Sequence, residues 1–250
     1  MEYRERTYRS RFSTSGLKSF PVKYKETDLW IGTDEASYSV SMQPYVLDIV
    51  RDLRDRMDEY LSGDPGYARS FVPYSPQPGA PLVFNLMSQA GYRTGIGPMS
   101  AVAGAFDKVV ADALAGRFSC REVIVENGGD IYANVCRDLD ISVFAGQSVL
   151  SEKVGIHIPS GSFPLGICTS SGTVGPSASL GRADAMMIVC RDVLLADSYA
   201  TAMANRIRTV SDLENVMNMC GDNPDILGAL AVKDDRMAIC GQFELRIFGN

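Results

Sequence analysis

The sequence predicts an α+β fold in which helices pack on an antiparallel β-sheet. Strand-like and helix-like segments occur in groups along the chain, whereas a regular βαβ protein would alternate them one by one. The segment Asn127-Gly128-Gly129 separates two strand-like runs and is a strong signal for a hairpin between antiparallel neighbours. A length of 250 residues with 46% hydrophobic and 22% charged residues suits one large domain or two closely packed halves.

Short strands are expected in the first part of the chain, at residues 8–12, 22–27, 29–32 and 37–42. An amphipathic helix is expected at about 44–61, because apolar residues such as Val46, Val50 and Met57 recur at helical spacing. The opposite face carries charge pairs four residues apart, which is typical of a helix facing solvent.

A proline-rich segment at 72–81 is interpreted as a long surface loop, because its flanks look equally globular. A short helix is expected at 82–90. Gly97-Pro98 then begins a helix to about residue 114. Its many alanines make it slim, so we expect this helix to be central and largely buried.

Strands dominate from residue 122 onwards, with two helices inserted late. The expected strands are 122–126, 131–135, 141–145, 154–159, 165–168 and 184–190. Helices are expected at 193–208 and 211–220, the second with Ser211 as its cap and Glu214 three residues later. The runs 228–232, 237–240 and 243–248 predict a terminal meander.

The composition excludes several classes of function. A net charge of -6 argues against a nucleic-acid partner, because phosphate binding needs a basic surface. No apolar run reaches the length of a membrane span, and the start Met1-Glu2-Tyr3-Arg4-Glu5 lacks a signal sequence, so we expect a cytoplasmic protein. The six cysteines contain no C-x-x-C pair, which predicts reduced and mostly buried thiols.

The segment 166–176 is the most informative part of the chain, because it combines a thiol with glycines and hydroxyl residues. Cys168 stands at its head, followed by Thr169, Ser170, Ser171 and Gly172. Small residues let the backbone curl around a ligand, and the amides and hydroxyls could lower the pKa of the Cys168 thiol. The structural alternative is a polar turn that follows a buried core thiol.

Asp197 and Thr201 stand four residues apart on a predicted helix, which places a carboxylate and a hydroxyl on the same face. Two hard oxygen ligands in this arrangement could hold part of a magnesium shell. The alternatives are a carboxylate favoured by the helix dipole and a threonine bonded back to the preceding turn.

Gly128, Gly129 and Asp130 form a second candidate for ligand contact. A double-glycine turn flanked by acids admits close backbone approach to a ligand, yet a hairpin needs the same residues. His157, the single histidine, is interpreted as a surface residue of a strand.

Four stretches occur in an order that resembles a known family. They are Gly95-Ile96-Gly97-Pro98-Met99-Ser100-Ala101-Val102-Ala103-Gly104-Ala105, Val125-Glu126-Asn127-Gly128-Gly129-Asp130-Ile131, Cys168-Thr169-Ser170-Ser171-Gly172 and Ala196-Asp197-Ser198-Tyr199-Ala200-Thr201-Ala202. The chain resembles an uncharacterised, cytoplasmic ApbE-like family over nearly its whole length. That family is a distant relative of the FAD:protein FMN transferases. The resemblance implies a single ApbE-like domain over residues 1–250.

The resemblance also implies roles for individual residues. Gly128, Gly129 and Asp130 would line a nucleotide pocket, and Ser170-Ser171-Gly172 would occupy the place of the T-S-G element of the transferases. Asp197 and Thr201 would be the ligands of a magnesium ion.

Two departures from the transferases argue against an intact FAD site. The segment from Gly172 to Asp197 contains no H-I-I-D-P-x-T-G loop, and residues 101–105 contain no lysine. The narrower family looks associated with sulfide assimilation on the route to homocysteine.

Three functions are consistent with these observations. In the first, Cys168 carries sulfur as a thiolate or persulfide for homocysteine formation, and the substrate is a persulfide or another small molecule. The amides and hydroxyls of Thr169 to Gly172 would stabilise the charged sulfur. In the second, the chain is a divergent magnesium-dependent protein that binds FAD and transfers FMN to a protein hydroxyl. In the third, it is a non-catalytic partner of a sulfur-transfer complex.

Overall fold

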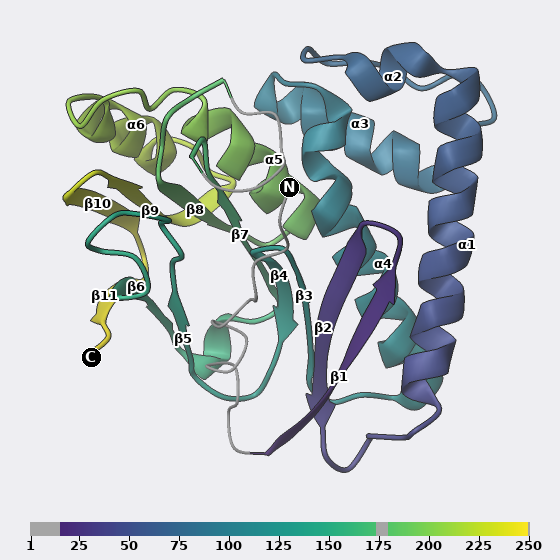
Figure 1. Cartoon of the computed structure of the whole chain (residues 1–250). Coiled ribbons are helices and arrows are strands. Elements are labelled where there is room, and N and C mark those ends of the chain that lie inside the picture. The colour runs from purple at the N-terminus through teal and green to yellow at the C-terminus, as the bar shows by residue number, and fades with distance from the viewer. Residues whose placement is uncertain (1–15, 174–179, 250) are drawn as a thin grey trace.

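The computed structural model describes residues 16–173 and 180–249. Their strands form a large sheet of order β1-β2-β3-β4-β7-β8-β9-β10 and a small sheet of order β11-β6-β5 (Figure 1). Each strand pair is antiparallel, which confirms the α+β fold with an antiparallel sheet and packed helices. The strands of the large sheet are β1 Leu17–Tyr24, β2 Thr27–Asp34, β3 Val123–Asn127, β4 Asp130–Asn134, β7 Leu165–Ser170, β8 Ala185–Cys190, β9 Ile226–Lys233 and β10 Arg236–Gly241. Those of the small sheet are β5 Leu139–Ser142, β6 Val154–Ile158 and β11 Glu244–Ile247.

The helices lie mainly in two groups along the chain, before β3 and between β8 and β9. They are α1 Met42–Gly63, α2 Pro65–Arg69, α3 Leu82–Thr94, η2 Pro98–Ala101, α4 Val102–Phe118, α5 Val193–Ala204 and α6 Asp212–Gly221, with a short turn η3 Ser160–Ser162 between β6 and β7. Helices α1, α3 and α5 lie where helices were expected, although α3 extends to Thr94 and α5 ends at Ala204.

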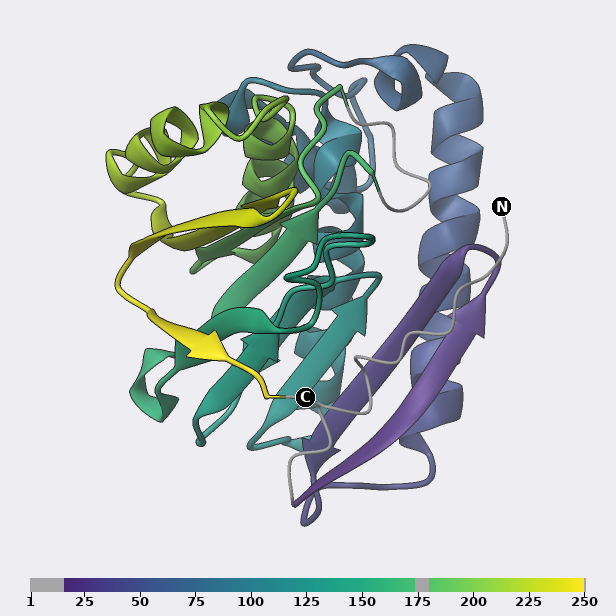
Figure 2. The same ribbon diagram turned by 60° about the vertical axis from the view of Figure 1, so that its left-hand side comes forward.

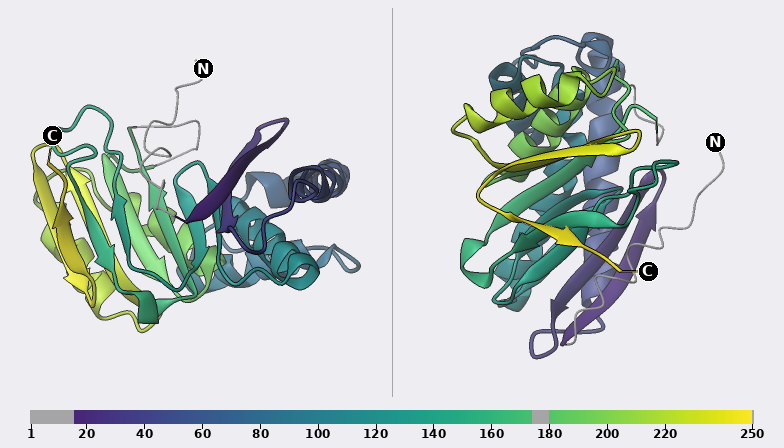
Figure 3. Two further views of the ribbon diagram at one scale, coloured as in Figure 1. Left: turned by 90° about the horizontal axis from the view of Figure 1, so that it is seen from below. Right: turned by 90° about the vertical axis from the view of Figure 1, so that its left-hand side faces the viewer.

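The large sheet separates two apolar cores. One core lies between the sheet and the helices, and the other lies between the sheet and the small sheet (Figure 3). Strand β11, near the C-terminus, runs across the side of the molecule opposite the helices (Figure 2). Because successive strand residues face opposite sides, Cys168 belongs to the first core and its neighbour Ile167 to the second.

Helix α5 is buried on nearly all sides, and two glycines make room for it. A Cβ atom on Gly104 of α4 would lie 2.6 Å from the carbonyl oxygen of Val193. A Cβ atom on Gly166 of β7 would overlap the backbone of the same Val193. The start of α5 is therefore held between α4 and β7 at a distance that only glycine permits.

Several expectations about individual elements were wrong. Residues 37–41 form turns and irregular backbone instead of a strand, and helix α1 begins at Met42. Strand β11 does not continue a terminal meander, because it pairs with β6 in the small sheet. Ser211 makes no capping hydrogen bond; instead the Asp212 carboxylate accepts hydrogen bonds from the Arg208 and Thr209 amides. The strand expected at 8–12 lies outside the described residues.

Substitution of Gly104 by alanine tests the close packing of α4 on α5. The new Cβ would meet backbone atoms that cannot rotate away, so we expect Gly104→Ala to lower the free energy of unfolding by about 1–3 kcal/mol. Gly116 lies on the same helix, and a Cβ added there would meet nothing within 4 Å, so Gly116→Ala should raise stability by about 0.5–1 kcal/mol. Urea unfolding measures both, and equal effects of the two substitutions would contradict the packing argument.

Candidate cation and nucleotide site

The turn between β3 and β4 forms one side of the candidate site. Gly128 and Gly129 have φ angles of +73° and +107°, values that favour glycine. The Gly129 amide donates to the Glu126 carboxylate over 2.9 Å, which closes the turn. The hairpin interpretation is confirmed, and Asp130 begins the next strand directly opposite Cys168.

Asp197 is the best-defined carboxylate of the site. It lies on α5, is buried, and its Oδ2 atom accepts a hydrogen bond from the Gly104 amide over 2.8 Å. Burial raises the pKa of Asp197 to about 7, although the amides of Gly104 and Ala103 act in the opposite direction. The carboxylate is thus anchored at the start of α4 by the close approach of the two helices.

Thr201 follows one turn later on α5. Its hydroxyl contacts the Ser170 hydroxyl at the end of β7, with 3.4 Å between the oxygen atoms. Asp197 and Thr201 share a face of the helix as the spacing predicts. The structure therefore brings Thr201 next to the hydroxyl segment that the sequence singled out.

Asp130 connects the turn with α5. Burial raises its pKa well above the ordinary value, and the negative charge of Asp197 raises it further. Hydrogen bonds with the Cys168 side chain and the Thr169 backbone partly offset that effect. Asp130 and Asp197 consequently lie close enough to repel each other.

Sequence reasoning missed Asp107 on α4. The residue is fully buried, and neither carboxylate oxygen has a hydrogen-bond partner within the described part of the chain. Burial raises the pKa of Asp107 well above its ordinary value. The negative charges of Asp130, Glu126 and Asp197 raise it further. The sequence did carry a signal for this residue, because an acid stands there in a helix that was expected to be buried. A buried carboxylate needs a hydrogen-bond donor or a cation as its partner.

The donor set of this site suits a hard cation. Asp197 and Thr201 lie one turn apart on α5, and the Thr201 hydroxyl contacts that of Ser170. Mg²⁺ prefers such oxygen ligands and retains several waters. In residues 16–173 and 180–249, no three His, Cys, Asp or Glu side chains converge closely enough to hold one metal ion. A zinc centre with three or four protein ligands therefore finds no support in that part of the chain.

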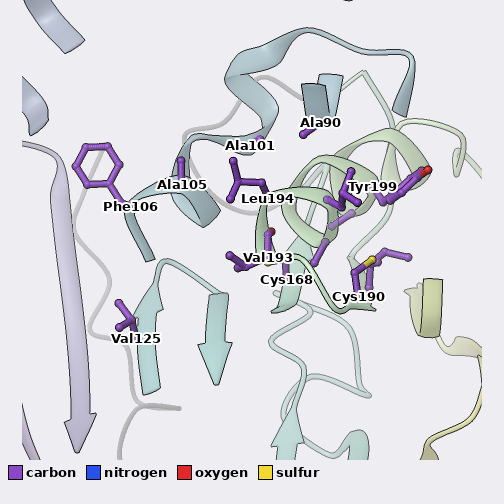
Figure 4. Close-up of a cluster of buried hydrophobic side chains, with 14 of the residues drawn as sticks. Ala90, Ala101, Ala105, Phe106, Val125, Cys168, Cys190, Val193, Leu194 and Tyr199 are labelled. Carbon is purple, nitrogen blue, oxygen red and sulfur yellow. The ribbon is translucent and has the colours of Figure 1, made fainter. Parts of the chain in front are cut away.

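Cys168 does not have the environment expected of a reactive thiol. Its side chain is fully buried and packs beside Val193 in the apolar cluster under α5, with the thiol 3.7 Å from the Val193 carbonyl oxygen (Figure 4). Burial raises the pKa of the thiol well above its ordinary value, and the charges of Asp130, Asp197 and Asp107 add to this. The expectation that the neighbouring donors lower this pKa was wrong, because the side chain points into the core beside carboxylates.

The residues after Cys168 divide into two groups. Thr169 and Ser170 are half-buried at the end of β7, where Ser170 meets Thr201. The Gly172 amide and the Ser171 hydroxyl both donate to the Ala183 carbonyl oxygen, over 2.8 and 3.3 Å. Ser171 and Gly172 thus hold the base of the loop together, and residues 174–176 of the predicted loop lie outside the described residues.

His157 lies on β6, away from this site. Its Nδ1 atom lies 2.7 Å from Asp140 on the neighbouring strand β5, and the residue is partly exposed. This position agrees with the interpretation of a surface histidine on a strand. Among the described residues, no helix is long and apolar enough to cross a lipid bilayer.

Comparisons with known proteins agree with this architecture. The flavin transferase ApbE of Vibrio cholerae has a similar structure, with a TM-score of 0.60, 12% sequence identity, and coverage of 90% of this chain and 96% of that one. The apo flavinyl transferase ApbE of Pseudomonas stutzeri gives a TM-score of 0.55 at 12% identity, over 90% and 93% of the two chains. The fold is therefore that of the ApbE proteins.

Sequence relatives place the chain more narrowly. A UPF0280 protein of Methanocella arvoryzae is 33% identical over 225 residues, which cover 90% of this chain and 89% of the relative. A UPF0280 protein of Methanosarcina barkeri is 34% identical, over 90% and 88% of the two chains. The sequence profile of the family described as "AbpE bacteria" matches residues 9–231, and the chain belongs to that family.

The buried Asp197 predicts a pH-dependent stability in protein freed of metal with EDTA. Its pKa of about 7 in the folded state lies above the ordinary value of 3.8, so the native state holds this proton more tightly than the unfolded state. The stability of the wild type relative to Asp197→Asn should therefore fall as the pH rises from about 4 to about 7, by at most about 4 kcal/mol. Urea unfolding at several pH values measures this difference, and a constant difference would contradict it.

The position of Cys168 predicts low reactivity in the native protein. We expect iodoacetamide at pH 8 to modify the exposed Cys136 much faster than Cys168, because burial shields the Cys168 thiol from the reagent and raises its pKa. Peptide mass spectrometry at timed intervals follows both sites, and urea should make their rates similar. Equal rates in the native protein would show that Cys168 is accessible as a thiolate.

Proposed function

We propose that this protein binds FAD together with a magnesium ion and transfers the FMN part to a hydroxyl group of a protein partner. The observation that carries the proposal is the contact between Thr201 and Ser170 beside the buried Asp197. This contact supports a site made of Asp197, Thr201 and Ser170, and the effect of the Asp197 charge on Asp130 supports adding the double-glycine turn to it. The names of the ApbE structures, flavin transferases, support the reaction class.

In this proposal, Asp197 and Thr201 hold the ion through a carboxylate and a hydroxyl oxygen. Bound magnesium neutralises negative charge on a pyrophosphate and polarises its phosphorus–oxygen bonds. The backbone amides of Gly104 and Ala103 donate hydrogen bonds to the Asp197 carboxylate and fix its orientation. The carboxylate could therefore bind the ion without a rearrangement of its side chain. Ser170 and Thr169 would donate hydrogen bonds to phosphate oxygens at the end of β7.

The transfer itself exchanges one phosphorus–oxygen bond for another. The acceptor hydroxyl oxygen attacks the phosphorus of the FMN half, the bond to the AMP half breaks, and AMP leaves with the bridging oxygen. The acceptor hydroxyl loses its proton to water, and the products are an FMN ester and AMP. No oxidant or reductant is needed.

In this proposal, the binding of FAD depends on a cation. Burial raises the pKa of Asp107, Asp130 and Asp197, so a pyrophosphate would meet acidic groups there that bring it no positive charge. Residues 101–105 add no lysine that could supply positive charge. We therefore expect Mg²⁺ to be needed for FAD binding itself and not only for the transfer step.

The sulfur-carrier hypothesis receives no support from the relatives or from the site. It needs a thiolate at Cys168, and burial together with three carboxylates acts against one. No observation on the described residues favours a role in sulfide assimilation or homocysteine formation. The same holds for a role as a non-catalytic partner of a sulfur-transfer complex.

FAD binding tests the proposal directly. Flavin fluorescence titration should show FAD binding with Mg²⁺ and none in EDTA, because without the ion the acidic site brings no positive charge to the pyrophosphate. Asp197→Asn and Thr201→Val should each weaken binding at least about tenfold, as expected for lost metal support.

Asp112→Asn is the matched control, because Asp112 is an exposed carboxylate on α4 and pairs with Lys108. It should leave FAD binding unchanged. Absence of FAD binding by the folded wild type at millimolar Mg²⁺ would refute the proposed function, and so would equal binding in EDTA.

A further inference from the structure

Three exposed arginines gather where the end of α5 meets the segment that leads to β8. The Arg182 amide donates to the Ile207 carbonyl oxygen over 2.7 Å, which holds the two segments side by side. Arg206 and Arg208 flank Ile207 in the sequence. Ile207 and both neighbours of Arg182 are buried, whereas the three arginines are exposed, so their side chains face solvent from one place. Arg182, Arg206 and Arg208 are called the arginine cluster below.

The guanidinium groups of the arginine cluster form no ion pair within residues 16–173 and 180–249. The arginines that do form ion pairs there are Arg51, Arg54, Arg56, Arg93, Arg137, Arg236 and Arg246. Asp212 lies near Arg208, but its Oδ2 atom accepts hydrogen bonds from the Arg208 amide and from the amide and hydroxyl of Thr209. In a chain with a net charge of -6, the cluster is therefore a local group of available positive charge.

The arginine cluster adjoins the candidate site. A Cβ atom on Gly172, at the end of the hydroxyl segment, would lie 3.0 Å from the Cα atom of Arg182. The Asn205 amide donates to the Thr201 carbonyl oxygen over 3.1 Å, so Arg206 follows little more than one helical turn after Thr201. A molecule bound to the cluster would consequently lie beside the hydroxyls of the site.

An apolar side chain borders the arginine cluster. Leu180 stands two residues before Arg182 and is 64% exposed, although the Asn205 side chain holds its amide over 2.8 Å. Guanidinium groups bind carboxylates through paired hydrogen bonds, and an exposed leucine favours an apolar contact. The combination fits a protein segment that is acidic and also carries an apolar residue.

We propose that the arginine cluster, together with Leu180, is the docking surface for an acidic segment of the protein that accepts FMN. This inference rests on the proposed function, because that reaction needs a protein partner whose hydroxyl reaches the site. Carboxylates of the partner neutralise the guanidinium groups and fix the orientation in which the acceptor hydroxyl approaches. A nucleic acid is less favoured, because three arginines on a chain of net charge -6 form only a small basic surface.

Fluorescence anisotropy of a short fluorescein-labelled peptide, rich in aspartate and containing one leucine and one threonine, tests this surface. The full chain is titrated in EDTA and without FAD, so peptide binding is measured apart from flavin binding. We expect the wild type to bind the peptide less tightly as the salt concentration rises, because salt screens exposed charges. Arg182→Gln, Arg206→Gln and Arg208→Gln should each weaken binding about two- to fivefold, and the triple variant about tenfold or more.

The matched control replaces three exposed arginines on other parts of the chain by glutamine. They are Arg56, Arg69 and Arg121. This control removes the same amount of positive charge and should bind the peptide as the wild type does. Leu180→Ser is a further variant that keeps the charge and should weaken binding through the lost apolar contact. A melting curve of each variant shows that it is folded.

Equal loss of peptide binding in the triple variant and in the control would overturn the inference, because net charge alone would then explain the loss. No peptide binding by the folded wild type would also overturn it. So would tighter binding of a fluorescein-labelled oligodeoxythymidine through the same arginines, which would indicate a nucleic-acid surface.

The proposed function and this inference fail in different ways. Peptide binding by a wild type that binds no FAD would refute the proposed function and leave a docking surface for an acidic segment. FAD binding with Mg²⁺ by a wild type that binds no peptide would refute only this inference.

Discussion

The close approach of α4, α5 and β7 is the constraint on which the rest of the structure depends. Val193 is held between Gly104 on one side and Gly166 on the other, and a single methyl group at either glycine would force the elements apart. This spacing lets the Gly104 amide reach the Asp197 carboxylate. The same helix position then places Thr201 against Ser170. A small change in helix packing would therefore displace the proposed metal ligands together.

The site contrasts with an ordinary buried ion pair in the same protein. Glu122 is also buried, but the Arg137 guanidinium beside it, together with the Cys136 amide, lowers the pKa of its carboxyl group. Burial is the main cause that raises the pKa of Asp107, Asp130 and Asp197, and for Asp107 and Asp130 the charges of other carboxylates raise it further. The first arrangement is an ion pair, whereas the second has the acidic groups that the proposed cation would neutralise. That difference distinguishes a structural group from a binding site.

Much of the fold followed from the sequence because the relevant signals are local. The helical spacing of Val46, Val50 and Met57 located α1, and the double glycine located the β3–β4 hairpin. Pairing between distant strands has no comparable local signal. The terminal strand therefore joined β6 in the small sheet, where the sequence order had suggested a meander. The ApbE-like fold itself was predicted from motifs spread along the chain and is confirmed by the structural neighbours.

The sequence by itself determined which residues could form a site: Asp197 with Thr201 at helical spacing, the hydroxyls that follow Cys168, and the turn before Asp130. Only the tertiary structure decided how these side chains are used. Strand register turned the Cys168 thiol into the core under Val193, because alternate residues face opposite sides of a sheet. Helix packing buried Asp107, and neither of its carboxylate oxygens has a hydrogen-bond partner among the described residues. Burial and charge are properties of the packed interior, and for that reason no local pattern could show that the thiol is neutral and that an acid lacks a partner.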